Sequence, residues 1–532
     1  MSSENVKEPN NKHALRRIFT SAEEVHFEDF SAIAAIDPDT LPALDKELIR
    51  HPRNDLSNSR RLIARHGDNI KFVREHGWYG WTSQYWSLDN GTRIVREAAQ
   101  NTADKIRGEA LAVAALGNFE DETPKEFKER LRAWRNFARS SGNTPRISAM
   151  IEEAKSGLEI VPEELDTHSC LVNVENGTLN LKAPDNGAEN FDGIVLEPHT
   201  RDHFITKLAA VYYDPQALSP RFRRFIDEIQ PDYEIANFLQ RWFGYCLTGS
   251  MKEQVILMCY GSGSNGKSVL MSLMNRLFGT YGQVLPFASL LHDDKRRGSE
   301  PSPDLAQLPG ARLVTAAEPE TGAKFSESMI KQITGGEKIK ARHLRQDFFE
   351  FRPECKVMLS FNNKPIIRGQ DDGIWRRLLL VPFKQRYVEQ HELTAYPGAK
   401  LKDKDLEAKL WEEAPGILNW VLDGYRMWAE NGLQIPDKVR AATSQYRDES
   451  SPVREFLSGC TARKPGQSTR AGILFEAFKL WAADNAIDPR NSTWFGYRMK
   501  ELHFEKHSDG KNVFYSGLSL SKEMMERLND IG

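Results

Sequence analysis

The sequence lacks the features that would place a protein in a membrane or in an oxidising compartment. It has no run of about 18 consecutive apolar residues, and its first residues, MSSENVKEPNNKH, contain no apolar core of a signal peptide. Its 5 cysteines are scattered and form no Cys-x-x-Cys pair, which argues against a zinc site and a disulfide framework. We therefore expect a soluble protein of the cytoplasm with no membrane partner.

The sequence also lacks an excess of charge of one sign. Its formal net charge is −3, so contact with nucleic acid would have to come from local basic patches. A hydrophobic content of 40% and a charged content of 28% are ordinary for a globular protein. The length of 532 residues is too great for one hydrophobic core and indicates several domains.

What the sequence does contain is a phosphate-binding motif, G-x-x-x-x-G-K-[ST], at residues 261–268. An apolar run at 255–260 precedes it and predicts a buried strand. Residues 267–278 follow with apolar side chains at helical spacing. The motif consists of Gly261, Ser262, Gly263, Ser264, Asn265, Gly266, Lys267 and Ser268. A flexible Gly/Ser linker with a chance lysine is the alternative, and the flanking strand and helix argue against it.

The motif predicts the chemistry of a nucleoside triphosphate site. Glycines allow backbone N–H groups to curl around phosphate oxygens, and the helix N-terminus adds partial positive charge. Lys267 would reach the β- and γ-phosphates, and the Ser268 hydroxyl would coordinate Mg²⁺. We therefore expect ATP and Mg²⁺ as the ligands.

A second apolar run, residues 311–317, ends at Glu318, with Glu320 two residues further on. A carboxylate at the tip of a neighbouring strand can hold the Mg²⁺ shell or polarise the attacking water. Glu318 is the first candidate for that catalytic and metal-binding role, and Glu320 is the second. A capping or surface glutamate is the alternative.

Two further strands carry polar residues at their ends. Residues 356–361 lead into Asn362, which could sense the γ-phosphate and orient the water. Residues 378–381 are preceded by Arg376 and Arg377, which would lie far from the phosphate of their own subunit. They are better placed to reach a neighbour's nucleotide as an arginine finger, which implies a ring or filament. A structural salt bridge is the alternative for either arginine.

A basic segment lies between these strands. Lys338, Lys340 and Arg342 alternate along an extended stretch, which favours a hairpin with one basic face. Phosphates would be the obvious partner for such a row, although many charged runs are only solvated surface.

Composition and motif positions divide the chain into six parts. They are a polar, weakly packed extension (1–68), an α+β domain (69–215), a helical collar (216–250), a nucleotide-binding core (251–390), a helical lid or linker (391–450) and a C-terminal domain (451–532). Helices are expected near 93–116 and 124–140. The aromatic residues around Trp78–Trp86 fit strands whose side chains form a core better than a base-stacking surface.

The C-terminal part predicts helices at 453–459, 472–485 and 492–502, then a hairpin over 504–520. That order is typical of a winged-helix domain. With 12 Lys and Arg against 10 Asp and Glu, it could contact DNA or another protein.

The motifs together resemble the superfamily 3 helicases, and specifically the phage and plasmid primase–helicase family related to the poxvirus primase–helicase. The matching segments are GSGSNGKS, RLVTAAEPE, KQITGGEKIKARHLRQDFFEFRPECKVMLSFNNKP and DDGIWRRLLLVPF, with upstream support from DHFITKLAAVYYDP, FLQRWFGYCLTG and SCLVNVENGTLNL. The resemblance covers roughly residues 70–390.

The resemblance implies an α/β fold with an AAA+-type P-loop ATPase core, an α+β N-terminal domain, helical connections and a C-terminal winged helix. Such proteins form rings, expected here to be hexamers, hydrolyse ATP between subunits and translocate on single-stranded DNA during replication. Carried over by position, the implied roles are Walker A for Gly266, Lys267 and Ser268, Walker B for Glu318, sensor 1 for Asn362, and the finger for Arg376 or Arg377. The channel hairpin would carry Lys338, Lys340, Arg342 and His343.

The resemblance also bears on partners and location. The expected partners are single-stranded and forked DNA, further copies of the chain, and a separate primase or initiator. The expected location is the cytoplasm, which is that of the host cell if a phage encodes the protein. Many relatives carry a primase–polymerase domain ahead of the helicase. Only some sixty to seventy polar residues precede the matching region here, so we expect no primase activity.

Two other functions stay open from the sequence. An ATP-binding origin or scaffold protein would assemble on DNA without productive unwinding. A P-loop kinase or metabolic NTPase unrelated to DNA would need neither a finger supplied by a neighbour nor a basic hairpin. Stimulation of hydrolysis by single-stranded DNA separates the helicase from the second alternative, and strand displacement on a forked duplex separates it from the first.

Overall fold

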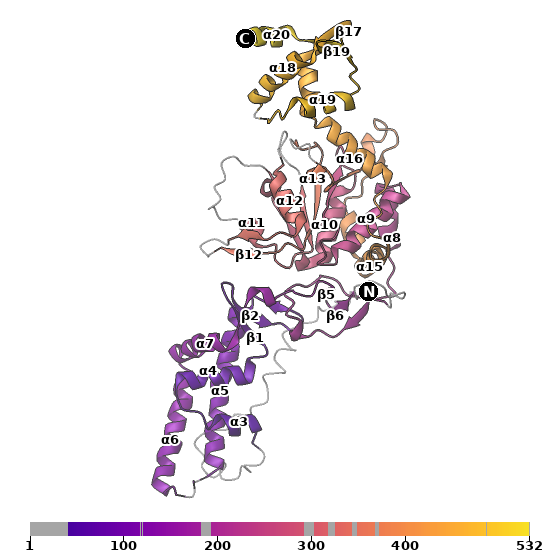
Figure 1. Cartoon of the computed structure of the whole chain (residues 1–532). Coiled ribbons are helices and arrows are strands. Elements are labelled where there is room, and N and C mark those ends of the chain that lie inside the picture. The colour runs from indigo at the N-terminus through magenta and orange to yellow at the C-terminus, as the bar shows by residue number, and fades with distance from the viewer. Residues whose placement is uncertain are drawn as a thin grey trace, which may run out of the picture. The chain divides into compact units, whose positions relative to one another are not determined.

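The computed structural model divides into two compact units (Figure 1). The residues that it describes are 41–117, 119, 121–181, 193–291, 303–317, 325–342, 348–367, 372–485 and 487–530. Within these, the first unit comprises 41–72, 78–80 and 89–159, and the second comprises 73–77, 81–88 and 160–530. The predicted α+β domain at 69–215 is therefore not one unit, because its strands after residue 160 belong to the second unit.

Helices make up most of the first unit, as Figure 1 shows. They are α3 (Ala43–Leu48), α4 (Asp55–His66), α5 (Gly91–Ala115), α6 (Pro124–Ser141) and α7 (Thr144–Leu158). The helices predicted near 93–116 and 124–140 are confirmed as α5 and α6. Helix α6 begins where it does because the Thr123 side chain accepts from the Glu126 amide and the Glu126 carboxylate accepts from the Thr123 amide.

Short strands lie along the same part of the chain. They are β1 (Ile70–Val73), β2 (Gly77–Trp81), β3 (Trp86–Ser87) and β4 (Glu159–Ile160). The aromatic side chains of this region are core residues, since Trp78, Tyr79 and Trp86 are each less than a tenth exposed. The interpretation of these aromatics as packing residues is confirmed.

The prediction that residues 1–68 pack weakly is wrong for α4. Leu62 is completely buried in an apolar cluster with Met150 and Ala154 of α7. Arg61 is also 0% exposed, so this basic residue is not part of a solvated face. The polar composition was misleading because Arg61 and Arg65 have a buried partner, Glu109, which no local pattern shows.

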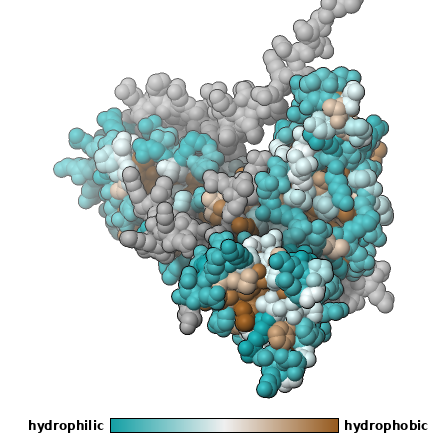
Figure 2. Space-filling model, turned by 90° about the horizontal axis from the view of Figure 1, so that it is seen from above, coloured by the Kyte–Doolittle hydropathy of each residue, from teal (hydrophilic) through white to brown (hydrophobic). Residues whose placement is uncertain are grey.

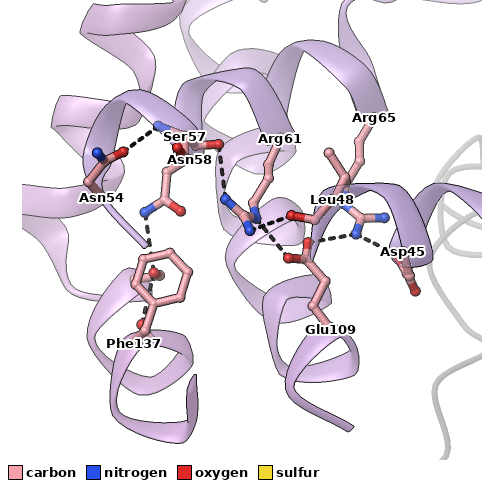
Figure 3. A network of polar contacts seen from close by, with 10 residues as sticks. Asp45, Leu48, Asn54, Ser57, Asn58, Arg61, Arg65, Glu109 and Phe137 are labelled. Carbon is pink, nitrogen blue, oxygen red and sulfur yellow. Dashed lines mark hydrogen bonds and ion pairs between the residues drawn. The ribbon is translucent and has the colours of Figure 1, made fainter. Parts of the chain in front are cut away.

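A network of buried ion pairs holds α3, α4 and α5 together (Figure 3). Arg61 Nε donates to Glu109 Oε2 at 2.7 Å, and Arg65 donates to Glu109 Oε1 at 3.0 Å. Arg65 also pairs with Asp45 at 2.5 Å, and Arg61 donates to the Leu48 carbonyl at 2.8 Å. Both oxygens of the Glu109 carboxylate are thereby satisfied inside the helical unit.

Replacing Glu109 with alanine is expected to lower the free energy of unfolding of the first unit by about 3–5 kcal/mol. The reason is that Arg61 would stay buried without its counter-charge. Hydrogen–deuterium exchange of α4 and α5 under native conditions measures this loss as faster exchange.

The matched control is Glu97→Ala, which removes the partner of Arg93 in an exposed pair with an N–O distance of 2.8 Å. It should cost about 0.5 kcal/mol or less. The double variant Arg61→Met/Glu109→Leu should recover most of the lost stability. If Glu109→Ala and Glu97→Ala lowered the free energy of unfolding equally, the buried network would stabilise the first unit no more than an exposed ion pair does.

A five-stranded parallel sheet forms the centre of the second unit. Its strands, in spatial order, are β14 (Leu378–Pro382), β8 (Ile256–Tyr260), β13 (Lys356–Phe361), β10 (Leu313–Ala317) and β9 (Gly282–Val284). The predicted strands at 255–260, 311–317, 356–361 and 378–381 are confirmed, and β9 is an addition. Because all pairs are parallel, the carboxyl ends of β13 and β14 flank the carboxyl end of β8.

The sheet is buried on both faces, which explains the unbroken apolar runs of its strands. Alternate residues of β8 enter different clusters, with Leu257 and Cys259 in one and Ile256 and Met258 in the other. Helices flank the strands, and Figure 1 shows α10 and α12 beside them. The helices of this part of the chain are α8 (Pro220–Ile229), α9 (Tyr233–Cys246), α10 (Lys267–Phe278), α11 (Pro303–Ala306), α12 (Glu327–Gly335) and α13 (Asp372–Trp375).

Further strands and helices complete the second unit up to residue 449. A small antiparallel sheet precedes the core, with β5 (Leu171–Val174), β6 (Gly177–Asn180) and β7 (Val195–Glu197). Two short pairs follow, β11 (Ile339–Ala341) with β12 (Phe349–Phe351), and β15 (Tyr387–Val388) with β16 (Lys400–Leu401). The later helices are α14 (Leu406–Trp411), α15 (Ala414–Asn431) and α16 (Asp437–Glu449).

Helices α9 and α15 touch backbone to backbone through two glycines. A Cβ on Gly244 would lie 2.0 Å from the Tyr425 amide nitrogen, and one on Gly424 would lie 2.0 Å from the Gln240 carbonyl oxygen. Both positions therefore require glycine. Helix α9, which precedes the strands of the sheet in the sequence, is packed in this way against α15, which follows them.

The last part of the second unit has its own apolar core around Phe456, Phe478 and Phe495. Its elements are α17 (Pro452–Cys460), β17 (Thr461–Arg470), α18 (Ala471–Asp484), α19 (Ser492–Glu501), β18 (Lys506–Ser508), β19 (Val513–Leu520) and α20 (Lys522–Asn529). The three predicted helices and the hairpin are present. Strand β17, which pairs with β19, was not predicted because its sequence, TARKPGQSTR, has no apolar alternation and its side chains are mostly exposed.

The face seen in Figure 2 is largely hydrophilic, with apolar residues in small separate areas. No helix within the described ranges has both the length and the apolar character needed to cross a bilayer.

Candidate functional site

The loop between β8 and α10 has the backbone geometry of an anion cradle. Gly263 and Gly266 have φ values of 91° and 86°, which residues with a Cβ rarely adopt. Ser264 has a φ of 45°, a strained value for a serine. No side chain in the described chain caps the N-terminus of α10. The amides of this first turn can therefore serve a bound anion.

Lys267 folds back over this loop. Its Nζ donates to the Gly261 carbonyl at 2.8 Å and to Asn362 Oδ1 at 3.2 Å. The residue is only 3% exposed, at the first position of α10. Its ammonium thus lies inside the cradle, where the motif predicts phosphate oxygens.

Asn362 reaches the same point from the neighbouring strand. It follows β13 directly, and β13 pairs in parallel with β8 so that Phe361 lies opposite Tyr260. Its side-chain amide lies 3.9 Å from where a Cβ on Gly263 would be. The structure therefore brings Asn362 to Lys267 and the glycine loop, although 95 residues separate Asn362 from Lys267 in the sequence.

Residues that follow β14 support the loop, and the sequence motif gave no sign of them. The Asn265 side chain donates to the Phe383 carbonyl at 3.3 Å, and the Tyr387 amide donates to the Ser264 carbonyl at 2.7 Å. On the other side, a Cβ on Gly266 would lie 2.4 Å from Ile229 Cγ2 of α8. Only the order of the parallel strands could have indicated that β14 ends next to β8.

Ser268 is exposed at the mouth of the cradle, in the first turn of α10. Glu318 and Glu320 lie outside the described residues. The strand that leads to them, β10, ends at Ala317 in register with Ser360, which itself lies opposite Cys259. The described residues include no group of three or more His, Cys, Asp or Glu side chains that could hold a metal ion.

The two candidate arginines differ in exposure and in their hydrogen bonds. Arg377 is 9% exposed and donates to Thr334 Oγ1 at 3.1 Å and to the Gly373 carbonyl at 2.5 Å. Arg376 is exposed. Both precede Leu378, which lies opposite Ile256 at the amino end of β8, so neither is near the glycine loop of its own chain.

The expected hairpin is formed by β11 and β12, with Lys340 opposite Glu350. Lys338 and Lys340 are exposed while Ile339 and Ala341 are buried, so the predicted alternation is present. The Glu350 carboxylate lies 3.6 Å from Lys338 Nζ and 4.0 Å from Lys340 Nζ, which partly neutralises the basic face.

The last residues of the hairpin that the structure describes include a cation–aromatic contact. The Arg342 guanidinium carbon lies 4.5 Å from the centroid of the Phe348 ring. His343 lies outside the described residues, so its predicted place in the basic face stays a prediction.

The thiol nearest the phosphate loop is not a nucleophile. Burial raises the pKa of Cys259 to about 12, even though Lys267 acts in the opposite direction. A thiol with so high a pKa stays protonated and unreactive at neutral pH. Cys259 is therefore not a candidate for the chemistry of this site.

Two family models match the chain. Residues 59–231 match a family described as D5 N terminal like, and residues 259–377 match a family of unknown function. The second match includes the whole glycine loop, Asn362 and the two arginines.

Curated viral proteins are similar to the chain over longer stretches. "Putative helicase L207/L206" of Acanthamoeba polyphaga mimivirus is 28% identical over 77% of this chain and 43% of its own length. "Putative helicase 022R" of Frog virus 3 is 26% identical over 59% of this chain and 31% of its own length. "Primase D5" of Fowlpox virus is 24% identical over 69% of this chain and 46% of its own length. The chain thus spans less than half the length of these relatives.

Proposed function

Because the chain belongs to the viral and phage primase–helicase family that includes the D5-like proteins, we propose that it is an ATP-driven replicative DNA helicase. The observation that carries this proposal is the convergence of Lys267 and Asn362 on the glycine loop. That arrangement supports the binding of a triphosphate with its γ-phosphate beside the end of β13. The order of the parallel strands supports an AAA+-type core.

The residues present fit a Mg²⁺–ATP complex. Mg²⁺ keeps several waters and needs few protein ligands besides the phosphates, so the Ser268 hydroxyl and one carboxylate are enough. Glu318 is our proposal for that carboxylate. The bound Mg²⁺ would neutralise charge on the phosphates, while Lys267 holds them and Asn362 positions the attacking water.

We propose that an arginine of a neighbouring subunit completes the ATP site. Arg376 precedes a strand whose other end flanks the cradle, so it lies about 20 Å along the sheet from its own loop. An exposed arginine at that distance serves a second copy of the chain, as in a ring. The internal hydrogen bonds of Arg377 make it a structural residue, which leaves Arg376 as the finger.

The hairpin is our proposed contact with single-stranded DNA. Lys338, Lys340 and Arg342 would meet phosphates, and His343 is proposed to extend the same face. Forked DNA and a separate primase or initiator are the proposed partners. The cytoplasmic location stays a prediction.

The double variant Lys338→Ala/Lys340→Ala is expected to weaken the stimulation of ATP hydrolysis by single-stranded DNA by about tenfold at low salt. Two phosphate contacts would be lost while the ATP site is untouched. ATPase rates at increasing oligonucleotide concentration measure the effect.

Glu350→Gln provides a test in the opposite direction. It removes the carboxylate between the two lysines and should increase the stimulation. Lys404→Ala, at another exposed lysine of the second unit, is the neutral control. If single-stranded DNA had no effect on hydrolysis by the wild type, the NTPase or kinase alternative would replace the helicase. If hydrolysis responded to DNA but a forked duplex stayed annealed, the scaffold alternative would replace it.

A further inference from the structure

Helix α13, which immediately precedes Arg376, is too short to hold this arginine in place by itself. Its four residues form a single turn, and an isolated turn is unstable in water. Ile374 and Trp375 of this turn are buried, while Arg376 is exposed. The position of Arg376 therefore depends on the helices that pack against the turn, which include α12 and α16.

Helix α16 contacts this turn at two points. The Tyr446 ring meets the Trp375 ring edge to face, with 5.4 Å between the two centroids. The next residue of the helix, Arg447, forms an ion pair with Asp372 at 2.8 Å. Tyr446 is only 2% exposed and belongs to the same apolar cluster as Trp375. Helix α16 therefore fixes the first and the last residue of α13.

Tyr446 also reaches the segment that follows Asn362. Its hydroxyl donates to the carbonyl of Pro365, three residues beyond Asn362. Glu449, three residues further along α16, pairs with Lys364 at 2.6 Å. One side of α16 is thus joined at two adjacent residues to the segment that leaves the candidate ATP site.

Helix α16 is itself anchored to the central sheet. Thr443 Oγ1 accepts a hydrogen bond from the Leu380 amide of β14 at 2.9 Å and donates to the Val439 carbonyl of its own helix at 2.9 Å. Strand β14 lies at one edge of the sheet, and α16 covers that edge. Because the helix is bonded to the sheet and the interior is close-packed, Tyr446 is a rigid support for both groups that it contacts.

We propose that Tyr446 is a positioning residue, which holds Arg376 in a fixed place relative to the segment after Asn362. In the proposed mechanism, Asn362 serves the ATP of its own subunit and Arg376 serves the ATP of a neighbour. Tyr446 joins the two through one side chain, so that a change at one ATP site reaches the arginine offered to the next. Because Arg376 is itself a proposed finger, this role of Tyr446 rests on the proposed function.

Tyr446→Phe removes the hydroxyl and keeps the ring against Trp375. It is expected to lower kcat for ATP hydrolysis by about tenfold and to leave KM within about twofold, because Lys267 and the glycine loop are untouched. Steady-state hydrolysis by the full chain measures both constants. Tyr425→Phe is the matched control, since Tyr425 is also buried and its hydroxyl donates to the Leu181 carbonyl at 2.9 Å. The control should lower the melting temperature by a similar amount and leave kcat unchanged.

Two further measurements separate a positioning role from a purely structural one. Arg376→Ala/Tyr446→Phe should hydrolyse ATP at the rate of Arg376→Ala, since a residue that acts through Arg376 has no effect once Arg376 is gone. Without nucleotide, the Arg376 amide, which donates to the Asp372 carbonyl, should exchange its hydrogen about tenfold faster in Tyr446→Phe than in the wild type. Tyr425→Phe should leave that exchange rate unchanged.

Three results would overturn the proposal. A kcat of Tyr446→Phe within about twofold of the wild type would exclude the positioning role. A further tenfold loss when Tyr446→Phe is combined with Arg376→Ala would show that Tyr446 does not act through Arg376. Unchanged exchange of the Arg376 amide would show that Tyr446 does not hold α13. If the wild type did not hydrolyse ATP, the proposed function would fail, and the exchange measurement would still decide whether Tyr446 fixes Arg376.

Discussion

Arg376→Ala is expected to lower the ATPase rate by about 10³-fold or more while the protein stays folded and assembled. Arg376 is exposed and precedes the amino end of β14, at the opposite end of the sheet from the loop that we propose to bind phosphate. In the proposed ring its guanidinium would therefore act on a nucleotide held by another subunit. The measurement is the steady-state ATPase rate, with sedimentation to verify assembly.

A mixed assembly makes this expectation sharper. Arg376→Ala subunits added to wild-type subunits should reduce hydrolysis by more than their fraction, because each one disables a neighbour's site. Strict proportionality would exclude a finger supplied in trans. Arg377→Ala is the matched control, and its main effect should be a lower melting temperature, because the Arg377 guanidinium is bonded to Thr334 and Gly373.

Lys267→Ala is expected to lower the ATPase rate by about 10²–10³-fold and to abolish strand displacement. The Lys267 ammonium lies between Gly261 and Asn362, at the point where charge on the transferred phosphate would develop. Alanine removes that charge and both hydrogen bonds. Steady-state hydrolysis and a forked-duplex assay measure the two losses together.

Lys267→Arg separates charge from shape at the same position. Arginine keeps the charge, but its planar fork does not fit a site built for a compact ammonium, so most activity should still be lost. Lys404→Ala should hydrolyse ATP as the wild type does. Strand displacement that survived in Lys267→Ala would show that unwinding does not use this site.

The central sheet and its phosphate loop were predictable because they depend on local patterns. Strands buried on both faces give continuous apolar runs, and α10 was predicted with the bounds that the structure has, Lys267–Phe278. Asn362 could be predicted as a site residue because it directly follows the apolar run of β13. Its hydrogen bond with Lys267 could not be predicted, because it depends on the parallel pairing of β13 with β8, which the sequence of one strand does not show.

Other features could not be predicted because they depend on partners distant in sequence. Arg61 looked like part of a polar extension, yet it is buried against Glu109, 48 residues away. The support of the loop by Phe383 and Tyr387 arises from the strand order alone. The roles of Glu318, Glu320 and His343 are still predictions, since these residues lie outside the described part of the chain.

The glycine contact between α9 and α15 has a consequence for motion. Since the backbones of the two helices meet at Gly244 and Gly424, a shift of one helix across the other would bring bulkier residues against backbone atoms. Helix α8, which precedes α9, contacts the phosphate loop at Gly266 through Ile229. A displacement of the loop on ligand binding would therefore be transmitted through α8 to α9 and α15. The two helices would move as a rigid pair, with little rearrangement of side chains between them.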